Sequence, residues 1–315
     1  MKDIVEEALE CNVPQDASNS VSSDEFGPPQ FLYVGIGTRG IKRLRSGLPP
    51  SGARSGPEQA IEDVVTKVAF LPDSDRSSDE SDQIDQYVDS VKSLAELNTD
   101  IDCCLITADI DNKSVITDIL AAADAIQDSL TIVLLSTSST DHVDIEHQIH
   151  ESVGTTVLIE DSDSHFDTIE SPSEWTSLSA DRLVQRLAMD FVTLCVGPNP
   201  VSVDYARVRT QWSGGRSAVP FVGKFHQSEL EDTDYLSAIS FVGPSAQRSI
   251  DWFGYAWIGP SFILADFEQF RESLDNTLRS NTANRRGVLG CGISEQLENS
   301  LFVSGVQFVD SISKS

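Results

Sequence analysis

The stretch FLYVGIGTRGIKRL, Phe31 to Leu44, decides how this chain folds. The run FLYVGIG is apolar enough for a fully buried strand, and IKRL predicts the start of a helix. Gly35, Gly37 and Gly40 form the turn between them. A strand that turns through glycines into a helix is the geometry in which backbone N–H groups hold phosphate. Many such turns use glycine only for tight packing, so the turn alone leaves both interpretations open.

Apolar runs alternate with helical patterns downstream of this stretch. The predicted strands are VVTKVAFLP, IDCCLITA, LTIVLLS and TTVLIE, and the predicted helices cover Ile84 to Leu97, Val115 to Ile126 and Ile145 to Val153. This alternation is typical of βαβ units and a parallel sheet. Ligands of such sheets lie at the carboxyl ends of the strands.

A long helical pattern with an apolar stripe follows, from Thr176 to Cys195. Beyond it, AVPFVGKF, SAISFVG, DWFGYAWIG, RRGVLGCGIS and SLFVSGVQFV are strand-like, with a helix from Ala265 to Arg279 between them. We expect an α/β, Rossmann-like parallel-sheet domain at 30–172, a long central helix at 173–199 and a smaller α+β second domain at 200–315. Residues 1–29 are predicted to be a disordered acidic tail with one short helix.

The composition excludes several classes of protein. With 315 residues and 39% hydrophobic content, the chain is long enough for two packed cores. It contains no run of about 18 to 20 apolar residues, and its acidic start lacks the positive region of a signal peptide. We therefore expect a cytoplasmic protein with no direct membrane insertion. The five cysteines have no CxxC pair and no regular spacing, so we expect buried apolar thiols and not disulfides or a zinc site.

The charge is strongly negative, with 22 Lys and Arg against 50 Asp and Glu and a net charge of −28. In dilute salt this excess would repel itself. In molar salt the Debye length falls to about 3 Å, and the same surface is screened. We interpret the acidity as an adaptation to a salt-rich cytoplasm, as in halophilic archaea. It argues against nucleic-acid polymers and anionic membranes as partners, because phosphate contacts require Lys or Arg.

Two segments carry a family resemblance. VSVDYARVRTQWSGGRSAVPFVGKF, Val201 to Phe225, resembles the FtsZ segment that follows the central helix, and GVLGCGISEQLENSLFVSGVQFV resembles the hairpin that ends the second FtsZ domain. The order of the predicted elements also fits: a glycine turn, an α/β sheet, a long helix and a smaller mixed sheet. The chain from Phe31 onward is therefore similar to the FtsZ/tubulin superfamily. The resemblance implies a GTPase-type first domain, a filament-forming protein and GTP or GDP as the cofactor to consider. No metal site is predicted.

The phosphate loops depart from the family pattern. Gly35, Gly37 and Gly40 stand at family glycine positions, but Thr38 and Ile41 replace two further glycines of the family loop and Lys42 replaces its Asn. Lys42 or Arg39 could supply charge that compensates for lost glycines. The signature glycine loop should follow IDCCLITA, where the chain has DIDNKSV, without a glycine and with acidic side chains. Carboxylates at this place oppose a polyphosphate unless a cation intervenes.

The family's hydrolytic loop contains two carboxylates, and its counterpart here is reduced. The resemblance places Ser202, Asp204 and Arg207 at its positions. A guanidinium cannot accept a proton, so Asp204 would be a vestigial catalytic residue, while Arg207 could pair with a neighbouring subunit's phosphate or carboxylates. An ordinary surface pair is the alternative. Asp181 stands where FtsZ has an Asp or Asn that contacts guanine, with a solvated helix residue as the alternative.

Two further patterns have simpler interpretations. His147 and His150 have an HxxH spacing that would suit a metal on one helix face, but no third ligand is evident. The aromatic residues of DWFGYAWIG are predicted to pack in the core rather than to stack on bases.

The sequence thus predicts a degenerate FtsZ-like structural or regulatory protein with weak or lost GTP hydrolysis. The resemblance implies a role in cell division, cell shape or another cytoskeletal assembly, with FtsZ-family filament proteins or copies of itself as partners. An active, polymerising GTPase with altered phosphate loops is the alternative, and a monomeric or dimeric adaptor is a third.

Overall fold

The computed structural model describes residues 28–45, 64–71, 84–110, 113–126, 129–138, 148–149, 152–161, 179–197, 203–230, 239–243, 249–278 and 287–309. Most of the predicted tail, most of the predicted helix at Ile145 to Val153, Ser202 and the histidines of the HxxH pattern lie outside these ranges.

The first half of the molecule is a parallel sheet. Its strands are β1 (Phe31–Ile36), β2 (Val65–Phe70), β3 (Gln86–Val88), β4 (Cys103–Asp109), β5 (Leu130–Thr137) and β6 (Thr155–Glu160). They lie in the order β3-β2-β1-β4-β5-β6, and each neighbouring pair is parallel. The predicted parallel sheet is therefore confirmed. Its central strands are buried along nearly their whole length, as the apolar runs require.

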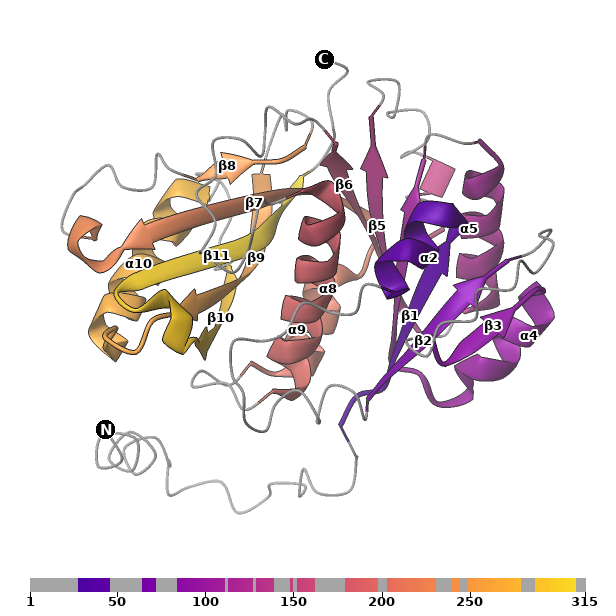
Figure 1. Cartoon of the computed structure of the whole chain (residues 1–315), viewed down its shortest axis with the longest axis horizontal. Helices are drawn as coiled ribbons and strands as arrows, with labels where there is room; N and C mark the ends of the chain where they lie inside the picture. The colour runs from indigo at the N-terminus through magenta and orange to yellow at the C-terminus, as the bar shows by residue number, and fades with distance from the viewer. Residues whose placement is uncertain are drawn as a thin grey trace.

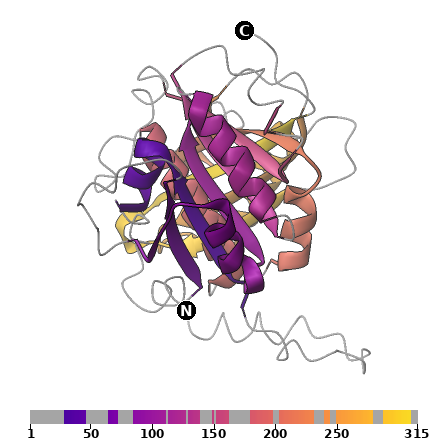
Figure 2. The same ribbon diagram turned by 90° about the vertical axis from the view of Figure 1, so that its right-hand side faces the viewer.

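Helices cover both faces of this sheet. On one face lie α2 (Gly37–Arg45) and α8 (Ala180–Val196), and on the other lie α4 (Val91–Glu96) and α5 (Lys113–Ala125). A 3-10 turn, η2 (Leu97–Asp100), extends α4. Figure 2 faces the molecule from the side on which α5 crosses the strands. The helix α8 begins at its N-cap Ser179, which accepts a hydrogen bond from the backbone of Arg182, a few residues later than the sequence predicts.

The second half continues the same sheet. Its elements are α9 (Tyr205–Trp212), β7 (Arg216–His226), η3 (Gln227–Glu229), β8 (Ser240–Phe241), β9 (Ser249–Ile258), α10 (Leu264–Leu278), β10 (Val288–Ile293), η5 (Glu295–Leu297) and β11 (Ser300–Val309). β7 pairs in parallel with β6, and the order then runs β7-β11-β9-β10 with mixed directions. Aromatic residues of β9 are buried, as predicted: Trp252, Phe253, Tyr255 and Trp257.

α8 stands between the two halves, as Figure 1 shows. A buried polar group on it faces the second half: the Asp190 carboxylate accepts from Arg186 Nε at 3.0 Å, from Trp257 Nε1 at 2.9 Å and from the hydroxyl of Ser304. The Arg186 guanidinium carbon also lies 4.8 Å from the Trp257 ring centroid. This network joins α8 to β9 and β11.

One predicted element is partly wrong. The range Ile84 to Leu97 was expected to be a single helix, but the structure has the short strand β3 and then α4. β3 pairs with β2 at the edge of the sheet, which suits Tyr87 and Val88. Ser90 then caps the helix by accepting from the backbone of Ser93. Local capping and edge pairing therefore override the helical periodicity.

The glycines of the first turn bring three backbone segments into contact. A Cβ on Gly35 would lie 2.7 Å from the carbonyl oxygen of Gly40, and a Cβ on Gly40 would lie 2.4 Å from that of Thr107. Gly37 has φ of 70° where β1 passes directly into α2. The glycines thus set α2 close against β1 and β4. In the described ranges, no helix is both long enough and apolar enough to cross a membrane.

Gly40→Ala tests this packing. Alanine inside a helix would ordinarily stabilise it by about 0.5 to 1 kcal/mol. Because the new methyl group meets the Thr107 carbonyl, we expect a loss of about 1 to 3 kcal/mol in the free energy of unfolding instead. Urea unfolding in molar KCl measures it. Thr38→Ala, at an exposed position of α2, is the control and should change stability by less than about 0.5 kcal/mol. Equal stability of the two variants would contradict the packing.

Candidate functional site: an arginine cluster at the carboxyl edge of the sheet

Arg39 lies at the carboxyl edge of the parallel sheet, where open α/β sheets bind their ligands. Its guanidinium contacts three carboxylates: Nε lies 2.7 Å from Asp181, Nη1 lies 3.1 Å from Asp109, and Nη2 lies 2.5 Å from Asp161. Asp109 ends β4, Asp161 directly follows β6, and Asp181 is in the first turn of α8. One side chain of α2 therefore ties together three elements that are distant in sequence.

Arg43 lies one helical turn further on and is 1% exposed. Its Nε and Nη2 lie 2.9 and 2.8 Å from the same oxygen of Asp181. Nη1 donates to the Thr107 hydroxyl and to the Ala108 carbonyl, both at 3.0 Å, and Nη2 donates to the Ser136 hydroxyl at 2.5 Å. The guanidinium is thus bound by β4, β5 and α8.

The pKa values follow from these contacts. Burial alone would raise the pKa of Asp181, but the Arg43 charge, with hydrogen bonds from Arg43 and Arg39, outweighs burial and lowers it below its ordinary value of 3.8. For Arg39, burial acts to lower the pKa, and the hydrogen bonds to Asp161, Asp181 and Asp109 reverse this and raise it. Both groups stay ionised at neutral pH.

The described ion pairs of the cluster are made by the chain's own side chains. Two guanidinium groups meet three carboxylates, so the group carries a net charge of −1. A polyphosphate placed here would have to displace the carboxylates from Arg39 and would face them at short range. Among the residues that the structure describes, side chains of the chain itself therefore supply the counter-charges of Arg39 and Arg43 at this edge.

The structure brings part of the predicted nucleotide site together. Gly35, Gly37, Gly40 and Asp181 surround the start of α2, where Asp181 binds Arg39 and Arg43. Lys42 is exposed and takes part in none of the ion pairs of the cluster. Of the two cations that the sequence suggested as compensating charge, Arg39 makes the ion pairs described above.

Asp204 and Arg207 lie at the opposite edge. Asp204 is the N-cap of α9, and its carboxylate accepts from the backbone of Ala206 at 3.0 Å. Arg207 is exposed on the first turn of that helix. The 17-residue helix α8 spans about 25 Å and separates this region from Asp181. A single chain therefore does not bring the arginine cluster and Asp204 together.

Sequence reasoning missed Arg43 and Asp161. Arg39 and Arg43 have the i, i+4 spacing that places two side chains on one helix face, directly after the glycine turn. Asp109 and Asp161 each stand at the end of a predicted strand. These two signals together indicate an ion-pair cluster at the carboxyl edge of the sheet. Within the described ranges, no group of three or more His, Cys, Asp and Glu side chains is arranged to hold a metal ion.

Comparison with solved structures identifies the fold as FtsZ/tubulin-like. An FtsZ dimer of M. jannaschii, described as empty, matches with a TM-score of 0.66 and 14% sequence identity, over 98% of this chain and 91% of that chain. The W319Y mutant of M. jannaschii FtsZ matches equally well in TM-score, with 15% identity, over 98% of this chain and 95% of that chain. TubZ of Bacillus thuringiensis serovar israelensis, in GDP-form protofilaments, matches with a TM-score of 0.58 and 12% identity, over 90% and 86% of the two chains.

No protein-family profile matches the chain, and no curated protein matches its sequence. At these sequence identities the structural matches establish the fold, and the predicted FtsZ/tubulin-like α/β architecture is confirmed.

Asp181→Asn tests the cluster. The variant removes the charge that both arginines share, so we expect a loss of about 1 to 3 kcal/mol in the free energy of unfolding at neutral pH. Because the folded pKa of Asp181 is lowered, its stabilising effect is complete above its ordinary value of 3.8 and disappears as pH falls through the lower folded value. The difference between wild type and variant should thus be constant above about pH 5 and shrink below pH 3.8.

Chemical unfolding at a series of pH values in molar KCl measures this difference. Asp204→Asn is the control, because asparagine also caps a helix and Asp204 lies outside the cluster. A difference that persists unchanged at pH 2 would show that the charge of Asp181 does not stabilise the fold.

Proposed function

We propose that this chain is an FtsZ-like subunit of a cytoskeletal assembly in which GTP hydrolysis is weak or lost. The observation that carries the proposal is the Arg39 cluster: at the edge where the fold would bind nucleotide, Arg39 is bound by Asp109, Asp161 and Asp181. The proposal includes a structural or regulatory role in cell division, cell shape or another cytoskeletal assembly, with FtsZ-family proteins or copies of this chain as partners, and the similarity of fold to FtsZ and TubZ supports it.

The distribution of charge supports a contact between subunits. The ion-pair cluster at the carboxyl edge has three carboxylates against two guanidinium groups, while the opposite edge presents Arg207 on an exposed helical turn. The solved structures of similar fold include an FtsZ dimer and TubZ protofilaments. Stacking the Arg207 edge of one copy on the acidic edge of the next would add a charge-assisted contact that requires no phosphate.

A second candidate is an active GTPase with altered phosphate loops. It is favoured by the partial exposure of Arg39, 27% of its side chain, because an exposed guanidinium can exchange a carboxylate for a phosphate oxygen. In this case Arg39 would neutralise phosphate charge and Asp204 of the following subunit would position the attacking water. The two candidates differ in whether Asp204 affects turnover.

Nucleotide content and turnover separate the two candidates. We expect no GTP or GDP in the denatured, purified protein and no GTP turnover above that of buffer in molar KCl, because the cluster carries its own counter-charges. Chromatography of the released nucleotide and a phosphate-release assay measure these. Turnover that is lost in Asp204→Ala but kept in the control Lys92→Ala would establish the GTPase instead.

Assembly is the second test. We expect the wild-type protein to form higher oligomers in molar KCl equally well with and without GTP, as followed by light scattering and sedimentation. Arg207→Glu reverses the charge at the proposed contact and should lower the extent of assembly about tenfold or more, equivalent to about 1.4 kcal/mol. Lys92→Glu makes the same charge change on α4, where the side chain is 88% exposed, and should leave assembly unchanged.

Comparison of Arg207→Glu with Lys92→Glu separates a specific contact from a general effect of charge. Loss of assembly in Arg207→Glu alone supports the stacked contact. Equal loss in both variants would indicate a general effect of charge, and a protein that remains monomeric under all these conditions would favour the adaptor function.

A further inference from the structure

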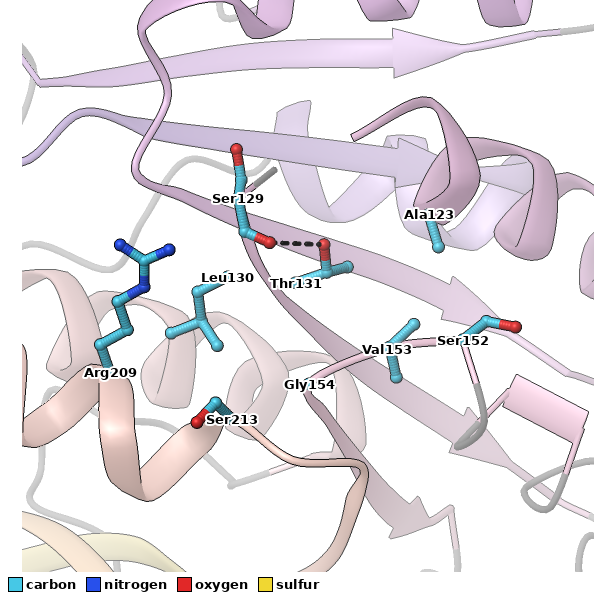
Figure 3. A pocket seen from close by; sticks show the side chains of 9 residues that line it. All are labelled: Ala123, Ser129, Leu130, Thr131, Ser152, Val153, Gly154, Arg209 and Ser213. Atoms are coloured by element: carbon cyan, nitrogen blue, oxygen red, sulfur yellow. Dashed lines mark hydrogen bonds between the residues drawn. The ribbon is translucent and has the colours of Figure 1, made fainter. Parts of the chain in front are cut away.

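A cavity of about 250 Å³ lies at the amino edge of the sheet, between α9 and the starts of β5 and β6. Figure 3 shows it from close by. The side chains of Arg209 and Ser213 come from α9 and its C-cap, and Leu130, Thr131 and Val153 come from the sheet side. The Arg39 cluster is at the other edge of the sheet, so this cavity is a separate site.

Arg209 is the cation of this cavity. Among the residues that the structure describes, no carboxylate lies within ion-pair distance of it, and its guanidinium makes no hydrogen bond to them. In the same chain Arg39, Arg43 and Arg186 each bond a carboxylate. The chain has 50 acidic side chains against 22 basic ones, and Arg209 is the basic side chain among the residues that line this cavity. Its planar donor pair suits one carboxylate in bidentate geometry.

Most of the hydroxyl groups that line the cavity already donate hydrogen bonds to backbone carbonyls. Ser129 donates its hydroxyl hydrogen to the Ile101 carbonyl at 2.7 Å, and Ser213 donates to the Thr210 carbonyl at 3.2 Å. The Thr131 hydroxyl points to the Ser129 carbonyl, at 3.5 Å, as the dashed line in Figure 3 shows. The guanidinium therefore supplies the main donors for a ligand, and the hydroxyl oxygens can only add acceptors.

The floor of the cavity is apolar. Ala123, Leu130 and Val153 line it and are at most 7% exposed. At about 30 Å³ for each water molecule, the cavity has room for about eight groups of that size. A ligand of this site thus combines one negative charge with a short aliphatic body.

Two helix C-termini at the cavity favour a ligand with one negative charge over a ligand with two. Ala123 is in the last turn of α5, and Ser213 is the C-cap of α9. Helix C-termini carry partial negative charge, which repels a dianion more than a monoanion. The lining residues include one cation, Arg209, and a phosphate group would ordinarily require more positive charge.

We propose that this cavity binds a small aliphatic carboxylate, with the carboxylate on Arg209 and the aliphatic body against Leu130 and Val153. The carboxylate is that of a free organic acid or of an acidic side chain in a short peptide, since both present the same group to the guanidinium.

Titration of the full chain with butyrate tests the site. Backbone NMR shifts should change at Leu130, Thr131, Val153 and Gly154, with sodium chloride at equal ionic strength as the reference. Butyramide, which has the same body without the charge, should bind at least about tenfold more weakly, because a charge-assisted pair with arginine is lost. A blocked glutamate dipeptide forms the second arm, and tighter binding than butyrate would assign the site to an acidic peptide.

Arg209→Gln should weaken butyrate binding about tenfold or more, while Arg182→Gln, on an exposed residue of α8, should leave it unchanged. Shifts that are equal in both variants, shifts confined to residues outside the cavity, or no saturation with either ligand would each overturn the proposal. Unchanged unfolding midpoints of the two variants show that any loss of binding is not a loss of fold.

Discussion

The burial of Arg43 at the carboxyl edge of the sheet is the constraint on which this structure depends. A guanidinium cannot be neutralised by losing a proton, and an unpaired buried charge costs several kcal/mol. The chain meets this requirement with Asp181, two hydroxyl groups and the Ala108 carbonyl. Gln185 adds a second tie by donating to the Arg43 carbonyl at 2.8 Å. The position of α8 relative to α2, β4 and β5 is thereby fixed by the protein alone.

The glycines of the first turn have a packing role in this structure. In a phosphate loop, glycines let a ligand approach the backbone. Here Gly35 and Gly40 let the backbone of α2 approach β1 and β4, and the close approach sets Arg39 and Arg43 over the strand ends. Filling either glycine with a side chain would lift the helix and with it both guanidinium groups. The same sequence feature therefore serves packing, and the charge needed at this edge comes from α2 itself.

A second buried pair, Arg186 and Asp190, extends this rigidity along α8 into the second half. Burial raises the pKa of Asp190 to about 6 against the opposing effect of Arg186, and burial lowers the pKa of Arg186. Both pKa shifts arise from burial, and the cost of removing Arg186 and Asp190 from water offsets much of the attraction between them. The network with Trp257 and Ser304 thus contributes mainly to the specific orientation of α8 against β9 and β11.

Much of the fold could be predicted from the sequence, because the central strands and α8 carry long, uniform apolar patterns. The division of Ile84 to Leu97 into β3 and α4 could not, since a three-residue edge strand depends on its partner β2. Asp181 was found by position within the family resemblance. Its partner Arg39 is 142 residues away, and their contact follows from strand order and the glycine packing, which no local pattern contains.

The charge of the whole chain and the geometry of the cluster belong together. In molar salt the Debye length is about 3 Å, which screens repulsion across a surface of net charge −28. The ion pairs of Arg39 are 2.5 to 3.1 Å long and partly shielded from solvent, so direct contact keeps them while more distant attraction is lost. Direct ion pairs of this length persist in a medium that screens attraction over longer distances.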